Sequence, residues 1–137
     1  MELRVARTFE AIAGIHTVIE DFCEQRAISE SATFAVKLVV EELFTNLVKY
    51  NRGGGETVLL GLERIDDRLV IRLADHDVDS FDPAQVPPVD VAAPLATRRE
   101  GGLGLHLVRS YVDEFDYEYT DRTMRLTAIK ILEADDV

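Results

Sequence analysis

At residues 39–50 the chain reads Val39-Val40-Glu41-Glu42-Leu43-Phe44-Thr45-Asn46-Leu47-Val48-Lys49-Tyr50. Apolar residues at positions 36, 39, 40, 43 and 47 recur with the helical period, which predicts a helix with one face in the core. Glu42 and Asn46 stand four residues apart and so share a face at the edge of that apolar stripe. A carboxylate that accepts a proton, one turn from an amide oxygen that binds a hard cation, suits chemistry on a metal-bound nucleotide. Such pairs also occur on ordinary solvated helices, so the pair alone leaves both interpretations open.

A glycine-rich segment further along the chain reads Arg98-Arg99-Glu100-Gly101-Gly102-Leu103-Gly104-Leu105-His106-Leu107-Val108. It begins an amphipathic helix that we predict from Gly102 to about Asp113, and the backbone N–H groups at such a helix start bind phosphate. The spacing does not fit a Walker A loop, because no Lys-Ser/Thr pair follows the last glycine, nor a dinucleotide fingerprint, because no strand precedes it. The segment is therefore a candidate phosphate site of another kind.

An acidic turn ends a strand that we predict from Arg68 to Asp75. The sequence there reads Leu69-Val70-Ile71-Arg72-Leu73-Ala74-Asp75-His76-Asp77-Val78-Asp79-Ser80-Phe81-Asp82-Pro83. A carboxylate at the end of a strand, directed into a cleft, can accept a hydrogen bond from the exocyclic amine that distinguishes adenine from guanine. Asp75 is therefore the candidate adenine contact.

In this order the three segments resemble the N box, G1 box and G2 box of the GHKL ATPase superfamily, and more narrowly its anti-sigma-factor serine/threonine protein kinases. The similarity spans nearly the whole chain and includes Arg125-Leu126-Thr127 near its end. It implies that ATP and Mg²⁺ are bound, that Glu42 is the general base, that Asn46 is the magnesium ligand and that Asp75 contacts adenine. It also implies a phosphate-covering lid hinged at Gly102 and Gly104, in a segment made of Gly101, Gly102, Leu103 and Gly104.

Three further residues bear on nucleotide binding. Lys49 lies within a turn of Asn46, and Arg99 directly precedes the glycines; each is either a phosphate contact or a solvated side chain. Asp77 stands where the family's G1 box usually has a glycine, and it brings a side chain and a negative charge close to the expected nucleotide. This departure leaves open whether the nucleotide site is functional, weakened or lost.

The order of elements predicts an α+β fold, a two-layer sandwich with a mixed, mostly antiparallel sheet and helices on one face. Alternation predicts strands at Leu3–Phe9, Thr57–Arg64, Arg68–Asp75, Glu114–Thr120 and Met124–Leu132. Helical periodicity predicts helices at 10–26 and from Ser29 or Glu30 to about Tyr50, with Ser29 as a cap. The segment from Phe81 to Glu100 contains all four prolines and is predicted to be a long functional loop.

Length, net charge and the distribution of apolar residues limit the classes of function that this chain can have. The length of 137 residues suits one domain, residues 1–137, and the net charge of −11 opposes direct binding to nucleic acid or anionic membranes. The one cysteine, Cys23, falls on an apolar helix face and is predicted to be buried. No signal-peptide core or membrane-spanning run is present, so we expect a cytoplasmic protein.

Two functions remain open. The first, implied by the resemblance, is an anti-sigma factor that phosphorylates a small antagonist protein in a partner-switching system of transcription regulation. That family also implies a sigma factor as partner and a homodimer, with residues 1–20 contributing to its interfaces. The second is a non-catalytic partner-binding module whose nucleotide site is weakened or lost because of Asp77. A fragment of a histidine kinase is a weaker third possibility, because no dimerisation helix with a phosphoacceptor is present.

Overall fold

The computed structural model of the chain describes residues 1–50, 55–78 and 108–137. It contains strand β1 (Glu2–Ala6), the short 3₁₀ helix η1 (Phe9–Ala11), helix α1 (Ile12–Gln25), helix α2 (Glu30–Tyr50), strands β2 (Thr57–Ile65), β3 (Arg68–His76), β4 (Glu114–Thr120) and β5 (Thr123–Ile131), and the 3₁₀ helix η4 (Ala134–Asp136). Residues 108–111 of the predicted 102–113 helix are helical, residues 112 and 113 are not, and residues 102–107 lie outside the described part of the chain.

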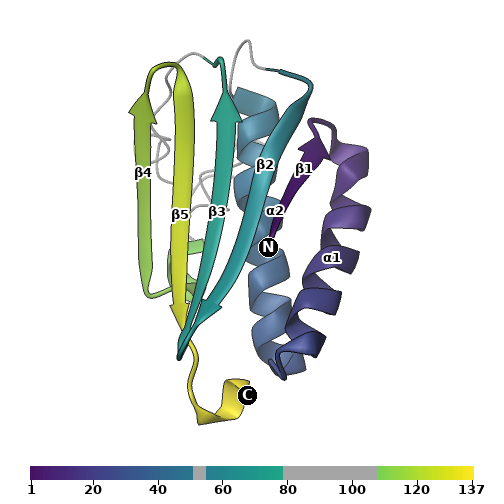
Figure 1. Ribbon diagram of the computed structural model, residues 1–137, viewed down its shortest axis with the longest axis vertical. Coiled ribbons are helices and arrows are strands. Elements are labelled where there is room, and N and C mark those ends of the chain that lie inside the picture. Colours follow the sequence, from purple (N-terminus) through teal and green to yellow (C-terminus); the bar gives the residue numbers. More distant parts are fainter. Residues whose placement is uncertain (51–54, 79–107) are drawn as a thin grey trace, which may run out of the picture.

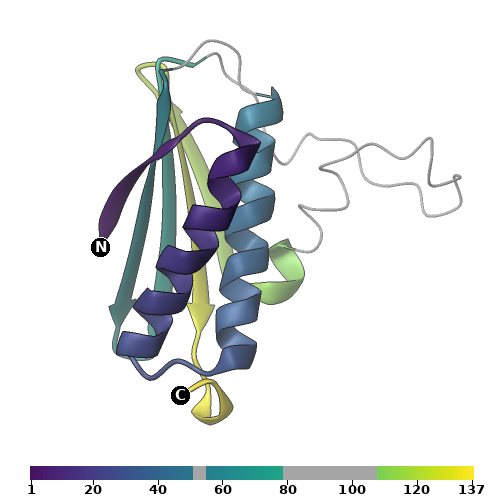
Figure 2. The same ribbon diagram turned by 90° about the vertical axis from the view of Figure 1, so that its right-hand side faces the viewer.

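The five strands form one sheet in the order β1-β2-β3-β5-β4. Each neighbouring pair among the described strands is antiparallel. Helices α1 and α2 cover one face of the sheet and leave the other face open (Figure 1, Figure 2). The predicted two-layer α+β sandwich with a mostly antiparallel sheet is thereby confirmed, and every described strand pair is antiparallel.

Alternate residues of the strands build the core on the helix-covered face. On β3 the alternate residues Leu69, Ile71, Leu73 and Asp75 are buried, so three apolar side chains and one carboxylate point toward the helices. Phe44 and Leu47 of α2 are fully buried against this layer. Met124 of β5, which pairs with Asp75 across the sheet, is also fully buried and fills core volume there. The face of α2 that carries the apolar stripe is therefore the one that faces the sheet, as its period predicts.

The first strand ends earlier than predicted. β1 stops at Ala6, whereas alternation predicts a strand up to Phe9. Ala6 pairs with Thr57, which is the first residue of β2, so the chain beyond Ala6 has no further strand partner on β2. It turns instead into η1, which leaves Phe9 48% exposed and starts α1 at Ile12.

Two other local predictions are confirmed. The hydroxyl of Ser29 accepts a hydrogen bond from the backbone N–H of Ala32 at 3.1 Å and caps the start of α2. Cys23 is buried on the inner face of α1 beside Ile19 and Phe22. Burial raises the pKa of the Cys23 thiol, which keeps it in the apolar, protonated form. In the described part of the chain, no helix is long and apolar enough to cross a membrane.

Tight turns at the ends of the hairpins fix the strand register. Asp121 and Arg122, between β4 and β5, both have positive φ values, of 52° and 58°. Two successive left-handed residues are typical of a two-residue type I′ turn, whose twist matches that of the strands it joins. This turn lies at the same end of the molecule as the carboxyl ends of α2 and β3 (Figure 1).

Candidate functional site

Helix α2 presents Asn46 toward the protein interior. The side chain is 4% exposed, and among the described residues its Oδ1 atom has no hydrogen-bond partner. A buried amide oxygen without a partner costs free energy unless a ligand satisfies it. A cation that takes oxygen ligands would supply what Oδ1 lacks, so this atom fits the predicted magnesium contact.

Glu42 lies one helical turn before Asn46 and is half-buried. Burial raises the pKa of the Glu42 carboxyl above its ordinary value, and the adjacent Glu41 carboxylate raises it further, while Lys49 acts in the opposite direction. A carboxylate with a raised pKa is a stronger proton acceptor than an ordinary surface glutamate. The half-burial and raised pKa of Glu42 fit the role of general base that the sequence predicts.

Asp75 sits at the end of β3, on the helix-covered face, and is fully buried. Its Oδ2 forms an ion pair with Nη2 of Arg7, whose side chain is 12% exposed. Nη1 of the same guanidinium donates a hydrogen bond at 3.2 Å to the carbonyl of Leu47, the residue after Asn46. One side chain thus spans from β3 to α2, and this contact places Asp75 beneath the carboxyl-terminal part of the helix that carries Glu42 and Asn46.

Residues 5–130 match the histidine kinase-like ATPase domain family. The chain belongs to this family. It is 26% identical over 141 residues to the serine-protein kinase RsbW of Halalkalibacterium halodurans, covering all of this chain and 86% of that protein. It is 28% identical over 144 residues to a serine-protein kinase RsbW of Bacillus cereus, covering all of this chain and 88% of that protein. The resemblance inferred from the motifs is thereby confirmed.

Solved structures show the same fold. The RsbU and RsbW domains of a Mycobacterium tuberculosis protein match with a TM-score of 0.71 at 10% identity, over 96% of this chain and 32% of that one. The SiaB-SiaC complex of Pseudomonas aeruginosa contains a chain that matches with a TM-score of 0.66 at 17% identity, over 94% of this chain and 88% of that one. At these identities the likeness concerns the fold of the ATPase domain.

Arg7 is the site residue that motif analysis of this ATPase domain missed. The alternation that begins in β1 nevertheless carries a signal, because Arg7, the residue after the strand, stands two positions from Val5. Val5 is buried in the core, so the next position in the alternation is also directed inward. An arginine at such a position requires a buried acidic partner, and Asp75 is that partner.

Asp77, at the family's glycine position, adopts the conformation that a glycine there would favour. Its φ is 59°, in the left-handed region. Its side chain is 81% exposed, and Oδ1 accepts a hydrogen bond at 3.0 Å from Nε of Arg122 in the β4–β5 turn. The backbone N–H of Val78 donates to the carbonyl of Arg122 at 2.9 Å, and the Tyr119 hydroxyl donates to the carbonyl of Val78 at 2.7 Å. The backbone at Asp77 thus has a conformation that glycine adopts readily, and Arg122 balances the charge of the Asp77 carboxylate.

The remaining predicted nucleotide contacts fall in two groups. Lys49 is exposed on the last turn of α2 and interacts with Glu42 electrostatically. Arg99, Gly101, Gly102, Leu103 and Gly104 lie outside the described residues of the ATPase domain.

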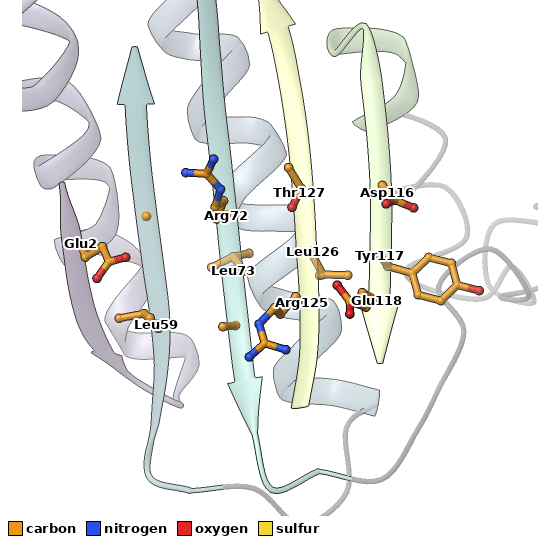
Figure 3. Close-up of a pocket in the computed structure, with 12 residues that line it drawn as sticks. Glu2, Leu59, Arg72, Leu73, Asp116, Tyr117, Glu118, Arg125, Leu126 and Thr127 are labelled. Atoms are coloured by element: carbon orange, nitrogen blue, oxygen red, sulfur yellow. The ribbon is translucent and has the colours of Figure 1, made fainter. Parts of the chain in front are cut away.

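A separate hollow of about 280 Å³ lies on the open face of the sheet (Figure 3). Arg72 and Arg125 border it, with Gly61 and Ala74 among the small residues that make the hollow. Glu42, Asn46 and Asp75 do not line it. Because neighbouring residues of a strand point to opposite faces, Asp75 on β3 faces α2 while Ala74 faces this hollow. The candidate nucleotide site is therefore on the helix-covered face of the ATPase domain.

Proposed function

We propose that the chain is an anti-sigma factor and an ATP-dependent serine/threonine protein kinase. The observation that carries this proposal is the arrangement on α2, where the buried, unpartnered Oδ1 of Asn46 lies one turn from the half-buried Glu42. Relatives named serine-protein kinase RsbW, matched over the whole of this chain, support phosphoryl transfer to a hydroxyl. The substrate in this proposal is a serine or threonine of a small antagonist protein.

Each residue of the candidate site has a role in the proposed reaction. The carboxylate of Glu42 accepts the proton of the attacking hydroxyl, which its raised pKa favours. Asn46 would hold Mg²⁺ through Oδ1. When bound, Mg²⁺ would neutralise negative charge on the phosphates of ATP. Asp75 accepts a hydrogen bond from the exocyclic amine of adenine and so selects the base.

The remaining phosphate contacts belong to the same proposal. The backbone N–H groups of the lid segment, Gly101, Gly102, Leu103 and Gly104, would bind the phosphates at the start of a helix. Lys49 and Arg99 would add positive charge near the transferred phosphoryl group. These contacts would lower the free energy of the transition state by stabilising its charge.

The partners follow from the proposed reaction and from charge. The net charge of −11 favours a partner with basic patches, and a sigma factor, which binds DNA, has this property. A phosphate on the antagonist adds negative charge at an interface with an acidic protein, so phosphorylation weakens that complex. The sigma factor is then held until an unphosphorylated antagonist displaces it. We propose that the chain acts as a single domain in a cytoplasmic homodimer.

Replacing Asp77 tests whether the altered G1 turn permits nucleotide binding. Asp77→Gly relieves a left-handed aspartate and removes a negative charge, but it also breaks the pair with Arg122. We expect only a few-fold gain in ATP affinity, because the native backbone already follows the glycine-like path. Calorimetric titration of both proteins with Mg-ATP measures this difference, with Arg122→Gln as the control that breaks the pair and keeps Asp77. Binding by Asp77→Gly alone would identify the native protein as a partner-binding module.

The rate of phosphoryl transfer should depend on pH through the ionisation of Glu42. A general base acts only when deprotonated, so activity is present above its pKa and is lost as the pH falls through it. Because the pKa of Glu42 is raised, the acid limb is expected above the ordinary glutamate range. Single-turnover rates measured against pH locate this limb. Glu41→Gln should move it to lower pH and Lys49→Met to higher pH, and identical limbs in all three proteins would contradict the assignment.

A further inference from the structure

Arg7 joins three parts of the chain at the candidate adenine contact. Its backbone N–H donates to the carbonyl of Glu56, just before β2, at 2.9 Å. Its guanidinium donates to the carbonyl of Leu47 on α2 and pairs with Asp75 at the end of β3. The carboxyl ends of β1, α2 and β3 lie at the same end of the molecule, which brings these groups together (Figure 1).

The burial of both partners limits how Asp75 can be oriented. Its side chain has no exposed surface, and that of Arg7 is 12% exposed. A buried carboxylate is costly unless a positive charge and hydrogen bonds compensate it. A guanidinium has a planar, fixed arrangement of donors, so a second contact to the Leu47 carbonyl fixes the direction from which Arg7 approaches Oδ2. The carboxylate is thereby held in one orientation.

We propose that Arg7 is the positioning residue for adenine selection, acting through Asp75. This inference rests on the proposed ATP-dependent function. A carboxylate paired with a guanidinium presents its oxygens as hydrogen-bond acceptors, so it favours a base that presents an amine. Without Arg7, the carboxylate loses both its counter-charge and the group that orients it, and its preference for the amine should weaken.

The test removes the guanidinium from the protein and the amine from the ligand. Affinities for ATP and for purine riboside triphosphate, which lacks the exocyclic amine, are measured by calorimetry with Mg²⁺ for the native protein and for Arg7→Met. We expect the native protein to bind ATP about tenfold more tightly or better, the size expected for a hydrogen bond to a charged group. In Arg7→Met this ratio should fall close to one, mainly through weaker ATP binding.

Two variants separate positioning from a general effect on folding or charge. Arg4→Met removes the same charge from an exposed position on β1 and should keep the native ratio. Arg7→Lys keeps the positive charge without the planar fork and should give an intermediate ratio. If Arg7→Met shows no cooperative thermal unfolding transition, the ratio of the affinities of Arg7→Lys for ATP and purine riboside triphosphate tests the proposal in its place.

The contradicting outcomes are distinct. A native ratio retained in Arg7→Met, or in Arg7→Lys if the former does not fold, would overturn the positioning role while leaving the kinase proposal intact. Tighter ATP binding by Arg7→Met would also overturn it, because the guanidinium would then compete with the base. No binding of ATP by the native protein would overturn both proposals.

Discussion

Glu42→Gln is expected to reduce phosphoryl transfer by about 100- to 10,000-fold, the contribution of a positioned general base, while ATP binding stays close to native. Glutamine has nearly the same shape as glutamate but does not accept a proton. Burial already favours the neutral form of Glu42, as its raised pKa shows, so the neutral amide should be tolerated in the fold. Single-turnover transfer from ATP to an antagonist protein measures the chemical step, and calorimetry measures binding.

Glu41→Gln is the matched control for this variant. Glu41 is the preceding residue of α2, and its Oε2 lies 3.4 Å from Nε2 of His16 on helix α1, so its side chain is directed away from the candidate site. Measured above the acid limb of the pH profile, Glu41→Gln should transfer phosphate at the native rate. Equal rates for the Glu42→Gln and native proteins would remove the general-base role.

Asn46→Leu is expected to remove the magnesium dependence of ATP binding and to cost about ten- to hundredfold in affinity for Mg-ATP, as for loss of one contact to a charged group. The free energy of unfolding of Asn46→Leu without nucleotide should rise or stay the same. The variant replaces a buried oxygen that has no partner in the described part of the chain with an apolar group of similar branching. Thermal unfolding without nucleotide measures the effect on stability, and titrations with and without Mg²⁺ measure the effect on affinity.

Asn46→Asp provides the comparison, since it keeps an oxygen ligand at the same position. It should retain magnesium-dependent binding, at some cost in stability because a carboxylate is then buried. If Asn46→Leu bound Mg-ATP as tightly as the native protein, Asn46 would not be a magnesium ligand. The orphaned Oδ1 would then have no functional explanation.

The sequence predicts an element well where residues within that element determine its structure. The apolar period of α2 identifies both the helix and the face that packs on the sheet, and Ser29 identifies its start. The end of β1 is wrong by three residues because it depends on β2, whose first residue, Thr57, pairs with Ala6. When a partner strand determines where a strand ends, the sequence of that strand alone does not predict its end.

The residues of the candidate site likewise include some that the sequence predicts and some that it does not. Glu42 and Asn46 follow from helical spacing, and Asp75 follows from its place at a strand end together with the family resemblance. Arg7 escapes motif analysis because its pairing with Asp75 joins the residue after β1 to the end of β3, and these two strands are not neighbours in the sheet. The pairing of Asp77 with Arg122 likewise depends on the conformation of two separate turns.

The most direct test of the central claim is titration of the native protein with ATP, once with Mg²⁺ and once with a chelator. A saturable, magnesium-dependent binding heat is the predicted result, because Asn46 presents a buried, unpartnered oxygen one helical turn from Glu42. Absence of binding in both conditions, from a protein that shows a cooperative thermal unfolding transition, would contradict the proposal that this ATPase domain is an active kinase.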